Sequence, residues 1–421
     1  MPTNTAATIR AEEVLARCKM LASFSEDQGS IRRTFLSPPM RDCHRALTKW
    51  LLAQGTDVTL DAAGNLRAFY AGEKLHAPRL LLASHLDTVP NAGPYDGVLG
   101  VVLAIALLEG LERRRLPFGI EIVGFSEEEG VRFGQPFIGS RALVGRLDEQ
   151  FLNSRDRDGI SIQTAIKDFG LNPAEIPQAI IGEDTFSYLE FHIEQGPVLD
   201  SLARPLGVVE AIAGQARMEF LFSGRANHAG TTPMHFRHDA ISAAAEWILE
   251  VERVAQINPG LVATVGQIAA KPGATNVIAG EARVSLDLRH RMDAIRLRVA
   301  ATFAGLAEQI ALRRGLTVRT RELLSQPAVQ MDKFLVSEIE NAMRSAGCEP
   351  HHMTSGAGHD AMILAEKVPA AMIFLRTPGG ISHDPAESVS LEDVAKALEC
   401  GWHLLEQLAN SSEFQKRTCR A

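Results

Sequence analysis

The chain has 421 residues, which is too many for one ordinary hydrophobic core, so we expect two domains. Charged residues make up 22% of the sequence and the formal net charge is −8, a balance that offers no basic surface for nucleic acid. No apolar stretch is long enough to cross a membrane, and scattered cysteines without a C-x-x-C pair favour reduced thiols in a cytoplasmic protein.

The first part of the chain carries the pattern of an α/β domain. Apolar residues recur at helical spacing in three segments, and shorter runs alternate or are continuously apolar, as in half-buried and fully buried strands. The pattern predicts helices over 8–23, 38–53 and 98–115, and strands over 58–60, 66–70, 80–83 and 120–126. The third strand leads through a Pro- and Gly-rich turn into a helix, which is the repeating unit of α/β proteins.

A second set of elements interrupts this domain. Residues 139–183 are polar and irregular, and between 212 and 328 the expected order is β-α-β-β-α-β, as in ferredoxin-like domains. The α/β pattern resumes with a helix near 332–345, a strand over 370–375 and a helix near 391–408. We therefore expect a discontinuous α/β domain formed by residues 1–211 and 329–421, with an inserted domain over 212–328.

Polar residues follow the apolar strand over 80–83. His85, Asp87 and Asp96 lie in the turn after it, and in open α/β sheets ligands bind at this end of the strands. A lone His-x-Asp is more often a strand-end histidine hydrogen-bonded to a neighbouring carboxylate. The turn alone therefore does not define a metal site.

The strand over 120–126 is followed by three consecutive carboxylates, Glu127, Glu128 and Glu129. A charge run of this kind is usually a solvated turn. Here it lies at the end of a buried strand, where negative charge is costly unless a cation is near.

Four further histidines lie in a strand or in glycine-containing loops: His192, His228, His359 and His383. Each of them taken alone is more often structural. Together with the earlier residues they complete the ligand inventory of two divalent cations that share one carboxylate: His85, Asp96, Glu129, His192 and His383. Asp87 is placed to accept the other N–H of the His85 imidazole.

Nine motifs occur in order: SHLDTV, YDGVLG, EEEGVRF, FHIEQGPVL, NHAGTTPM, GATNVIAG, DLRH, SGAGHDA and GISHDPAE. With them the sequence resembles, from about Arg10 to Leu408, the dinuclear zinc aminoacylase and carboxypeptidase clan. Within that clan it is similar to the hydantoinase/carbamoylase amidase family. The resemblance implies an α/β fold: a mixed-sheet, zinc-peptidase-like catalytic domain with an inserted ferredoxin-like α+β domain that dimerises and closes as a lid.

The resemblance also implies roles for the candidate ligands. His85, Asp96 and His192 would hold one metal ion, and Asp96, Glu129 and His383 would hold the other, so that Asp96 bridges. Glu128 matches the family's general base. Two divalent ions are thus expected per subunit, with Zn²⁺ suiting the histidines and Mn²⁺, Co²⁺ or Ni²⁺ also accepted by a carboxylate-rich pair.

Further residues match the family's substrate-binding positions: Gln195, Gln215, His228, Asn276, Arg289 and the loop Gly358-His359. Without the resemblance, Arg289 would be read as part of a strand-end ion pair. In the family the inserted domain forms a homodimer, and the histidine of NHAG reaches the partner's active site. His228 is therefore expected to act in trans on a small ureido or N-carbamoyl acid.

The implied activity is metal-dependent hydrolysis of N-carbamoyl-L-amino acids to the amino acid, ammonia and carbon dioxide. Hydrolysis of allantoate is the nearest alternative, because Arg289 and Asn276, which would clamp the substrate's carboxylate, serve both substrates. A β-ureidopropionase, an aminoacylase or dipeptidase, and a non-catalytic small-molecule-binding relative rank behind these two. His192 weighs against the peptidase branch, which usually has a carboxylate at that position.

Overall fold

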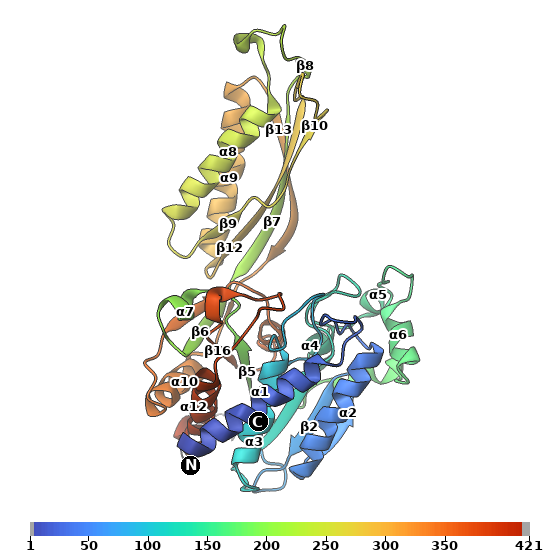
Figure 1. Cartoon of the computed structure of the whole chain (residues 1–421), viewed down its shortest axis with the longest axis vertical. Helices are drawn as coiled ribbons and strands as arrows, with labels where there is room; N and C mark the ends of the chain where they lie inside the picture. The colour runs from blue at the N-terminus through green and yellow to red at the C-terminus, as the bar shows by residue number, and fades with distance from the viewer. Residues whose placement is uncertain (1–3, 415–421) are drawn as a thin grey trace. The chain divides into compact units, whose positions relative to one another are not determined.

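The structure is a computed structural model that describes residues 4–414, and these fall into two compact units (Figure 1). The second unit consists of Ala211–Gln330 together with Thr354–Gly358, and the first unit consists of the rest. The predicted division of roles between a catalytic and a dimerisation domain stays a prediction.

A mixed sheet forms the centre of the first unit. Its strands lie in the order β1-β2-β4-β3-β5-β16-β6, and β15 also pairs with β6. The strands are β1 (Asp57–Leu60), β2 (Leu66–Tyr70), β3 (Arg79–His85), β4 (Gly119–Phe125), β5 (Thr185–Ile193), β6 (Leu206–Ile212), β15 (His352–Ser355) and β16 (Ala370–Leu375). The four central strands β4, β3, β5 and β16 run parallel, so their carboxyl ends share one edge.

Helices of the first unit pack on this sheet and on one another. The long ones are α1 (Asn4–Ala22), α2 (Pro38–Ala53), α3 (Val98–Gly110), α10 (Lys333–Ser345) and α12 (Leu391–Asn410). Helix α3 is apolar on every side because it contacts β3 and β5 as well as α1 and α12. Helix α2 begins at Pro38, where a missing N–H costs nothing.

Short elements occupy the connections of the first unit. They are α4 (Ile138–Leu143), α5 (Glu149–Leu152), α6 (Ile162–Asp168), η1 (Pro173–Ala179), α7 (Val198–Ser201), α11 (Asp360–Leu364) and η3 (Pro378–Gly380). The described cysteines Cys18, Cys43, Cys348 and Cys400 are free and buried, and Cys419 lies outside the described residues. Over residues 4–414, no helix has the length and apolar character needed to cross a membrane.

The second unit has an antiparallel sheet in the order β10-β12-β7-β13, with β9 also on β12, covered by two helices. Its elements are β7 (Gly214–Ser223), β8 (Asn227–His228), η2 (Met234–Phe236), α8 (Ala240–Gln256), β9 (Val262–Thr264), β10 (Ile268–Lys271), β11 (Val277–Ile278), β12 (Glu281–His290), α9 (Asp293–Arg313), β13 (Thr317–Gln326) and β14 (Val329–Gln330). The predicted β-α-β-β-α-β order is therefore confirmed, and the mixed α/β fold class with it.

Several details differ from the sequence prediction. The helix predicted over 98–115 is wrong at its carboxyl end: α3 ends at Gly110, and the positive φ angles of Glu112 (50°) and Arg113 (66°) stop a right-handed helix. Strands β6, β8, β10, β11, β14 and β15 were not predicted. Five of them have only two to four residues, and β6 is a longer apolar run that contains Gly207 and Glu210, so the strand pattern is hard to recognise.

Candidate active site

Two histidines and an aspartate converge at the shared edge of the parallel strands. His85 ends β3 and His192 lies near the end of its parallel neighbour β5, while Asp96 lies in the turn before α3. Gly97 follows with a φ of 67°, and a Cβ there would lie 2.4 Å from the His85 ring. Glycine therefore allows the turn to approach the imidazole this closely.

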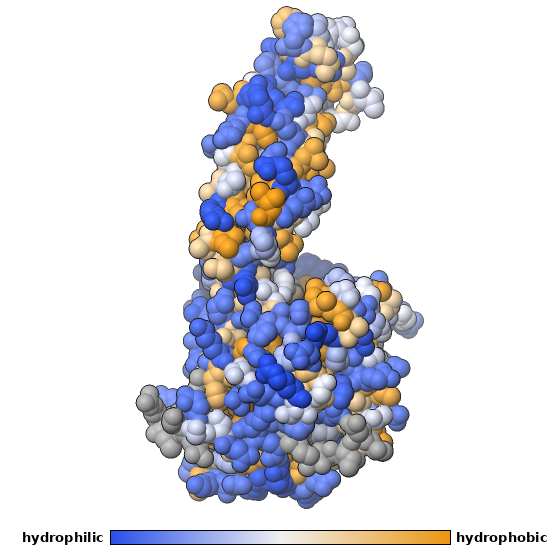
Figure 2. All heavy atoms as spheres, turned by 90° about the vertical axis from the view of Figure 1, so that its left-hand side faces the viewer, coloured by the Kyte–Doolittle hydropathy of each residue, from blue (hydrophilic) through white to orange (hydrophobic). Residues whose placement is uncertain are grey.

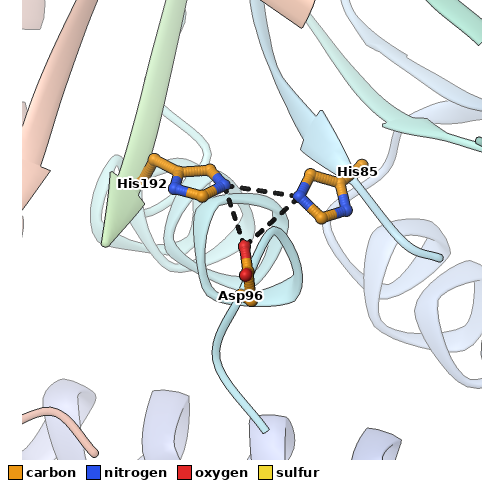
Figure 3. A group of neighbouring side chains, drawn as sticks. All are labelled: His85, Asp96 and His192. Atoms are coloured by element: carbon orange, nitrogen blue, oxygen red, sulfur yellow. Dashed lines mark hydrogen bonds and ion pairs between the residues drawn. The ribbon is translucent and has the colours of Figure 1, made fainter. Parts of the chain in front are cut away.

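The three side chains direct acceptor atoms toward one another (Figure 3). His85 Nε2 lies 3.3 Å from His192 Nε2, and Asp96 Oδ1 lies 3.5 Å and 3.2 Å from these nitrogens. Each Nδ1 instead faces a carbonyl, at 3.0 Å from Asp87 O and 2.9 Å from Ile193 O. Protons on both Nδ1 atoms satisfy those carbonyls, so each Nε2 faces Asp96, where it can carry a proton or, in place of that proton, bind a shared cation.

The second oxygen of Asp96 faces another group of potential ligands. His383 Nε2 lies 3.2 Å from Asp96 Oδ2 and 3.6 Å from Glu129 Oε1. Asp96 Oδ1 is buried, and no hydrogen-bond donor reaches it from the described residues. Asp96 thus belongs to two groups of potential ligands, one with His85 and His192 and the other with Glu129 and His383. Both groups fit a divalent cation in ligand type and number.

Asp87 supports the loop that carries the neighbouring glutamates. Its two carboxylate oxygens accept the backbone N–H groups of Glu128 at 2.9 Å and Glu129 at 3.1 Å. The nearest partner of His85 Nδ1 is the carbonyl of Asp87, because the carboxylate Oδ1 lies farther away, at 3.5 Å. Asp87 therefore positions the histidine through its backbone and the glutamate loop through its side chain.

Burial and neighbouring charges shift the pKa values of the carboxylates in this site in different directions. Burial raises the pKa of Glu128 well above its usual range; the His85 imidazole opposes the shift and the Glu129 carboxylate adds to it. Burial, and then the charge of Asp96, raises the pKa of Glu129 to about 7. Burial works against the ionised form of Asp96, but three surrounding imidazoles hold its pKa well below the usual value. Burial therefore gives the Glu128 carboxylate a higher affinity for a proton than an ordinary glutamate has.

Two predicted substrate residues of the first unit lie beside the ligands. Gln195 has a φ of 59°, and its Nε2 donates to Asp96 Oδ2 at 2.8 Å. His359 is 1% exposed and packs edge-on against His192, with ring centroids 4.5 Å apart. Burial, reinforced by His192, lowers the pKa of His359 well below its usual value, so its imidazole is neutral. Gly358, the residue before it, belongs to the second unit.

The predicted substrate residues of the second unit occupy two places. Gln215 and Arg289 are direct partners across β7 and β12. His228 lies in the ribbon of β8 and β11, and the amide of its neighbour Ala229 donates to Asn276 O. This ribbon leads into β12 at Glu281, eight residues before Arg289 (289 − 281). At about 3.3 Å per residue, roughly 25 Å of strand separates the two pairs within one chain.

Two carboxylates that the sequence did not single out contact predicted site residues. Glu387 Oε1 accepts the backbone N–H of Tyr95 at 3.0 Å and of Asp96 at 3.1 Å, which fixes the turn that presents Asp96. Asp287 accepts hydrogen bonds from Arg289. Both lie inside motifs already recognised, GISHDPAE and DLRH, and that position was the available signal.

The fold and these residues agree with a family match. Residues 81–407 match the model of Peptidase family M20/M25/M40, and the chain belongs to this family. It is a hydrolase and, within the family, an amidase of the hydantoinase/carbamoylase group.

Two relatives and one solved structure illustrate how similar this chain is to known proteins. A probable allantoate deiminase of Oryza sativa subsp. japonica is 36% identical, over 92% of this chain and 86% of that protein. An N-carbamoyl-L-amino acid amidohydrolase of Geobacillus stearothermophilus is also 36% identical, over 95% and 99%. A solved hydantoinase/carbamoylase family amidase from Burkholderia ambifaria superposes with a TM-score of 0.89 at 31% identity, over 95% and 97%.

Proposed function

We propose that this protein is a metal-dependent amidohydrolase that cleaves the carbamoyl C–N bond of N-carbamoyl-L-amino acids. The observation that carries the proposal is the Asp96 carboxylate between two groups of potential ligands, with Glu128 beside them. One ion would be held by His85, Asp96 and His192, and the other by Asp96, Glu129 and His383. We expect Zn²⁺, with Mn²⁺, Co²⁺ or Ni²⁺ as alternatives.

Glu128 acts as the general base. When bound, the two cations lower the pKa of a water molecule and polarise the substrate carbonyl. Glu128 accepts the proton of the attacking water and then returns it to the leaving nitrogen, a role that its burial and raised pKa support. Asp87 keeps Glu128 in place through the backbone hydrogen bond at 2.9 Å.

The substrate is held by residues of the second unit and by Gln195. The planar guanidinium of Arg289 suits the carboxylate of the substrate. His228 donates to the oxygen that becomes negatively charged during attack on the carbonyl. His228 is exposed, and its Nδ1 accepts the amide of Gly230 at 3.0 Å, which leaves Nε2 available as a donor.

We further propose that His228 and Asn276 serve the active site of a partner in a homodimer. Roughly 25 Å of β12 separates them from Arg289 in one chain, far more than a small ureido acid spans. The helical face of the second unit exposes Leu249, Leu297 and Leu312 on α8 and α9, and apolar patches interrupt the hydrophilic surface there (Figure 2). Exposed apolar patches of this kind support an interface with a second copy.

Allantoate is the second candidate substrate. Four curated relatives named allantoate deiminase are 34% to 36% identical to this chain, and three named N-carbamoyl-L-amino acid amidohydrolase are 32% to 36% identical, so sequence similarity alone favours neither. Both compounds carry a ureido group and a carboxylate. A panel of allantoate, N-carbamoyl-β-alanine and several N-carbamoyl-L-amino acids, assayed after loading with Zn²⁺ or Mn²⁺, decides between them.

Replacement of Glu128 tests the chemical step. Glu128→Gln keeps the size of the side chain but cannot accept a proton, so we expect kcat to fall by about 10²- to 10⁴-fold. Metal content, measured by elemental analysis, should stay at the wild-type level because Glu128 is not among the five proposed ligands. Near-normal turnover would exclude Glu128 as the base, and loss of metal would assign it a ligand role instead.

A further inference from the structure

Four polar side chains form a square on the face of the second unit's sheet that lies away from its helices. Gln215 and Arg217 lie on β7, and Asp287 and Arg289 lie on β12. Arg289 is the cross-strand partner of Gln215, and Asp287 is the partner of Arg217. Alternate residues of the same strands, such as Ala216 and Leu288, are buried in the core under α8 and α9. The register of the two strands therefore brings the four polar groups together.

The Asp287 carboxylate is the common acceptor of this square. Arg289 donates to it twice, from Nε to Oδ1 at 2.7 Å and from Nη2 to Oδ2 at 3.1 Å. Gln215 Nε2 and Arg217 Nε also donate to Oδ2. Burial alone would raise the pKa of Asp287, but these donors, with Arg289 first, lower it, so the group is ionised. Asp287 thus holds two of the predicted substrate residues at once.

The same contacts orient the remaining donors of Arg289. Nη1 donates to the carbonyl of Gly356 at 2.6 Å, in the segment Thr354–Gly358 that returns to the second unit. A guanidinium has five N–H groups, and three of those of Arg289 are engaged; the other two, one on Nη1 and one on Nη2, have no partner among residues 4–414. Those two can face a single carboxylate in the bidentate geometry that arginine favours. Two cations and one anion also leave the square with a net positive charge.

We infer that Asp287 is a positioning residue for substrate selection: it locks Arg289 and Gln215 so that the free edge of the guanidinium recognises the carboxylate of the ureido acid. Without Asp287, Arg289 has several rotamers available and binding must order it first, which weakens affinity. The inference rests on the proposed function. It adds a residue whose effect is on recognition of the acid group and not on the chemical step.

The test measures binding separately from turnover. In metal-loaded Glu128→Gln protein, where hydrolysis is blocked, calorimetry gives the Kd of an N-carbamoyl-L-amino acid and of its neutral carboxamide. We expect Asp287→Asn to weaken binding of the acid about tenfold or more and to leave binding of the carboxamide within about twofold. With Glu128 intact, the same substitution should raise KM for the acid with little change in kcat.

Glu219→Gln is the matched control. Glu219 lies on the same face of β7 and pairs with Arg283 at 3.2 Å, away from Gln215 and Arg289. The Glu219→Gln substitution in the Glu128→Gln protein should leave the Kd of both the acid and the carboxamide unchanged. Asp287→Glu keeps the charge but moves it by one methylene, so an intermediate loss for the acid alone is expected, and this variant replaces Asp287→Asn if the latter does not fold.

The outcomes separate the two claims. An unchanged Kd for the acid, or an equal loss for acid and carboxamide, overturns the role of Asp287 while wild-type turnover still supports the proposed function. A metal-loaded wild-type protein that hydrolyses no ureido acid overturns the proposed function, and the inference about Asp287 with it.

Discussion

At the scale of single residues, His44 is a buried titratable group outside the active site. It lies on α2, its Nε2 has no hydrogen-bond partner in the described part of the chain, and its ring packs edge-on against Phe169. Burial, with the charges of Arg33 and Arg41, lowers its pKa to about 3. The folded protein therefore keeps His44 neutral at pH values where the unfolded chain would protonate it.

This difference makes stability depend on pH. The unfolded state binds the extra proton below its pKa of 6.5, so the free energy of unfolding falls as the pH is lowered from 6.5 toward 3. At about 1.4 kcal/mol per pH unit, His44 accounts for a loss of about 2 kcal/mol at pH 5. His44→Phe should remove this part of the acid dependence. Urea unfolding at pH 7.5 and pH 5 measures it, and an unchanged acid dependence in the variant would contradict the assignment.

The sequence predicted which residues belong to the candidate site, but it predicted few of the contacts that these residues make. Glu128 and Glu129 follow a recognisable buried strand, and motif order suggested the rest of the ligand set. The partners of Asp87 could not be predicted, because its carboxylate meets amides of a loop more than 40 positions away. Asp287 was missed for a similar reason: its contact with Gln215 depends on the register of two strands 72 positions apart.

At the scale of secondary-structure elements, the fit of α3 against the sheet depends on a glycine. A Cβ on Gly100 would lie 2.1 Å from the carbonyl oxygen of Phe191 in β5 and 2.7 Å from Ser84 Cβ in β3. A backbone oxygen cannot rotate away as a side chain can. Phe191 and Ser84 immediately precede His192 and His85, so any displacement at this contact reaches the ligands.

We predict that Gly100→Ala destabilises the fold by about 1–3 kcal/mol, because overpacking outweighs the gain of about 1 kcal/mol that alanine brings to a helix interior. Metal content after reconstitution should also fall. Gly305→Ala in α9 is the control, since nothing lies within 4 Å of its added Cβ, and it should stabilise by about 0.5–1 kcal/mol. Thermal unfolding and elemental analysis test both variants, and wild-type values for Gly100→Ala would show that α3 adjusts freely.

Most elements could be predicted because their apolar period is regular. Helices α2, α10 and α12 each have one buried face, and β16 is a continuous apolar run. The end of α3 could not be predicted, because Leu111 continues the apolar stripe beyond Gly110 while the backbone at Glu112 turns left-handed. Local φ angles of this kind leave no hydrophobic signal.

At the scale of the whole molecule, the proposed action of His228 in trans can be tested by mixing inactive protomers. Glu128→Gln and His228→Ala homodimers should each have low activity. After mild dissociation and mixing, half of the dimers are mixed, and each of these has one active site with both residues intact. We expect recovery of up to about a quarter of wild-type activity, because half of the dimers carry one working site of two. No recovery, with mixed dimers confirmed by differently tagged protomers, would argue for action in cis.

The return of Thr354–Gly358 to the second unit has a consequence for protein engineering. A hybrid protein that exchanges only the continuous insert Ala211–Gln330 with that of a relative would combine a foreign Arg289 equivalent with the original Gly356 carbonyl. Residues 354–358 belong to the same unit as the exchanged insert, but in such a hybrid they would still come from the original protein. Exchange of both pieces together is the smallest graft that preserves the surroundings of Arg289.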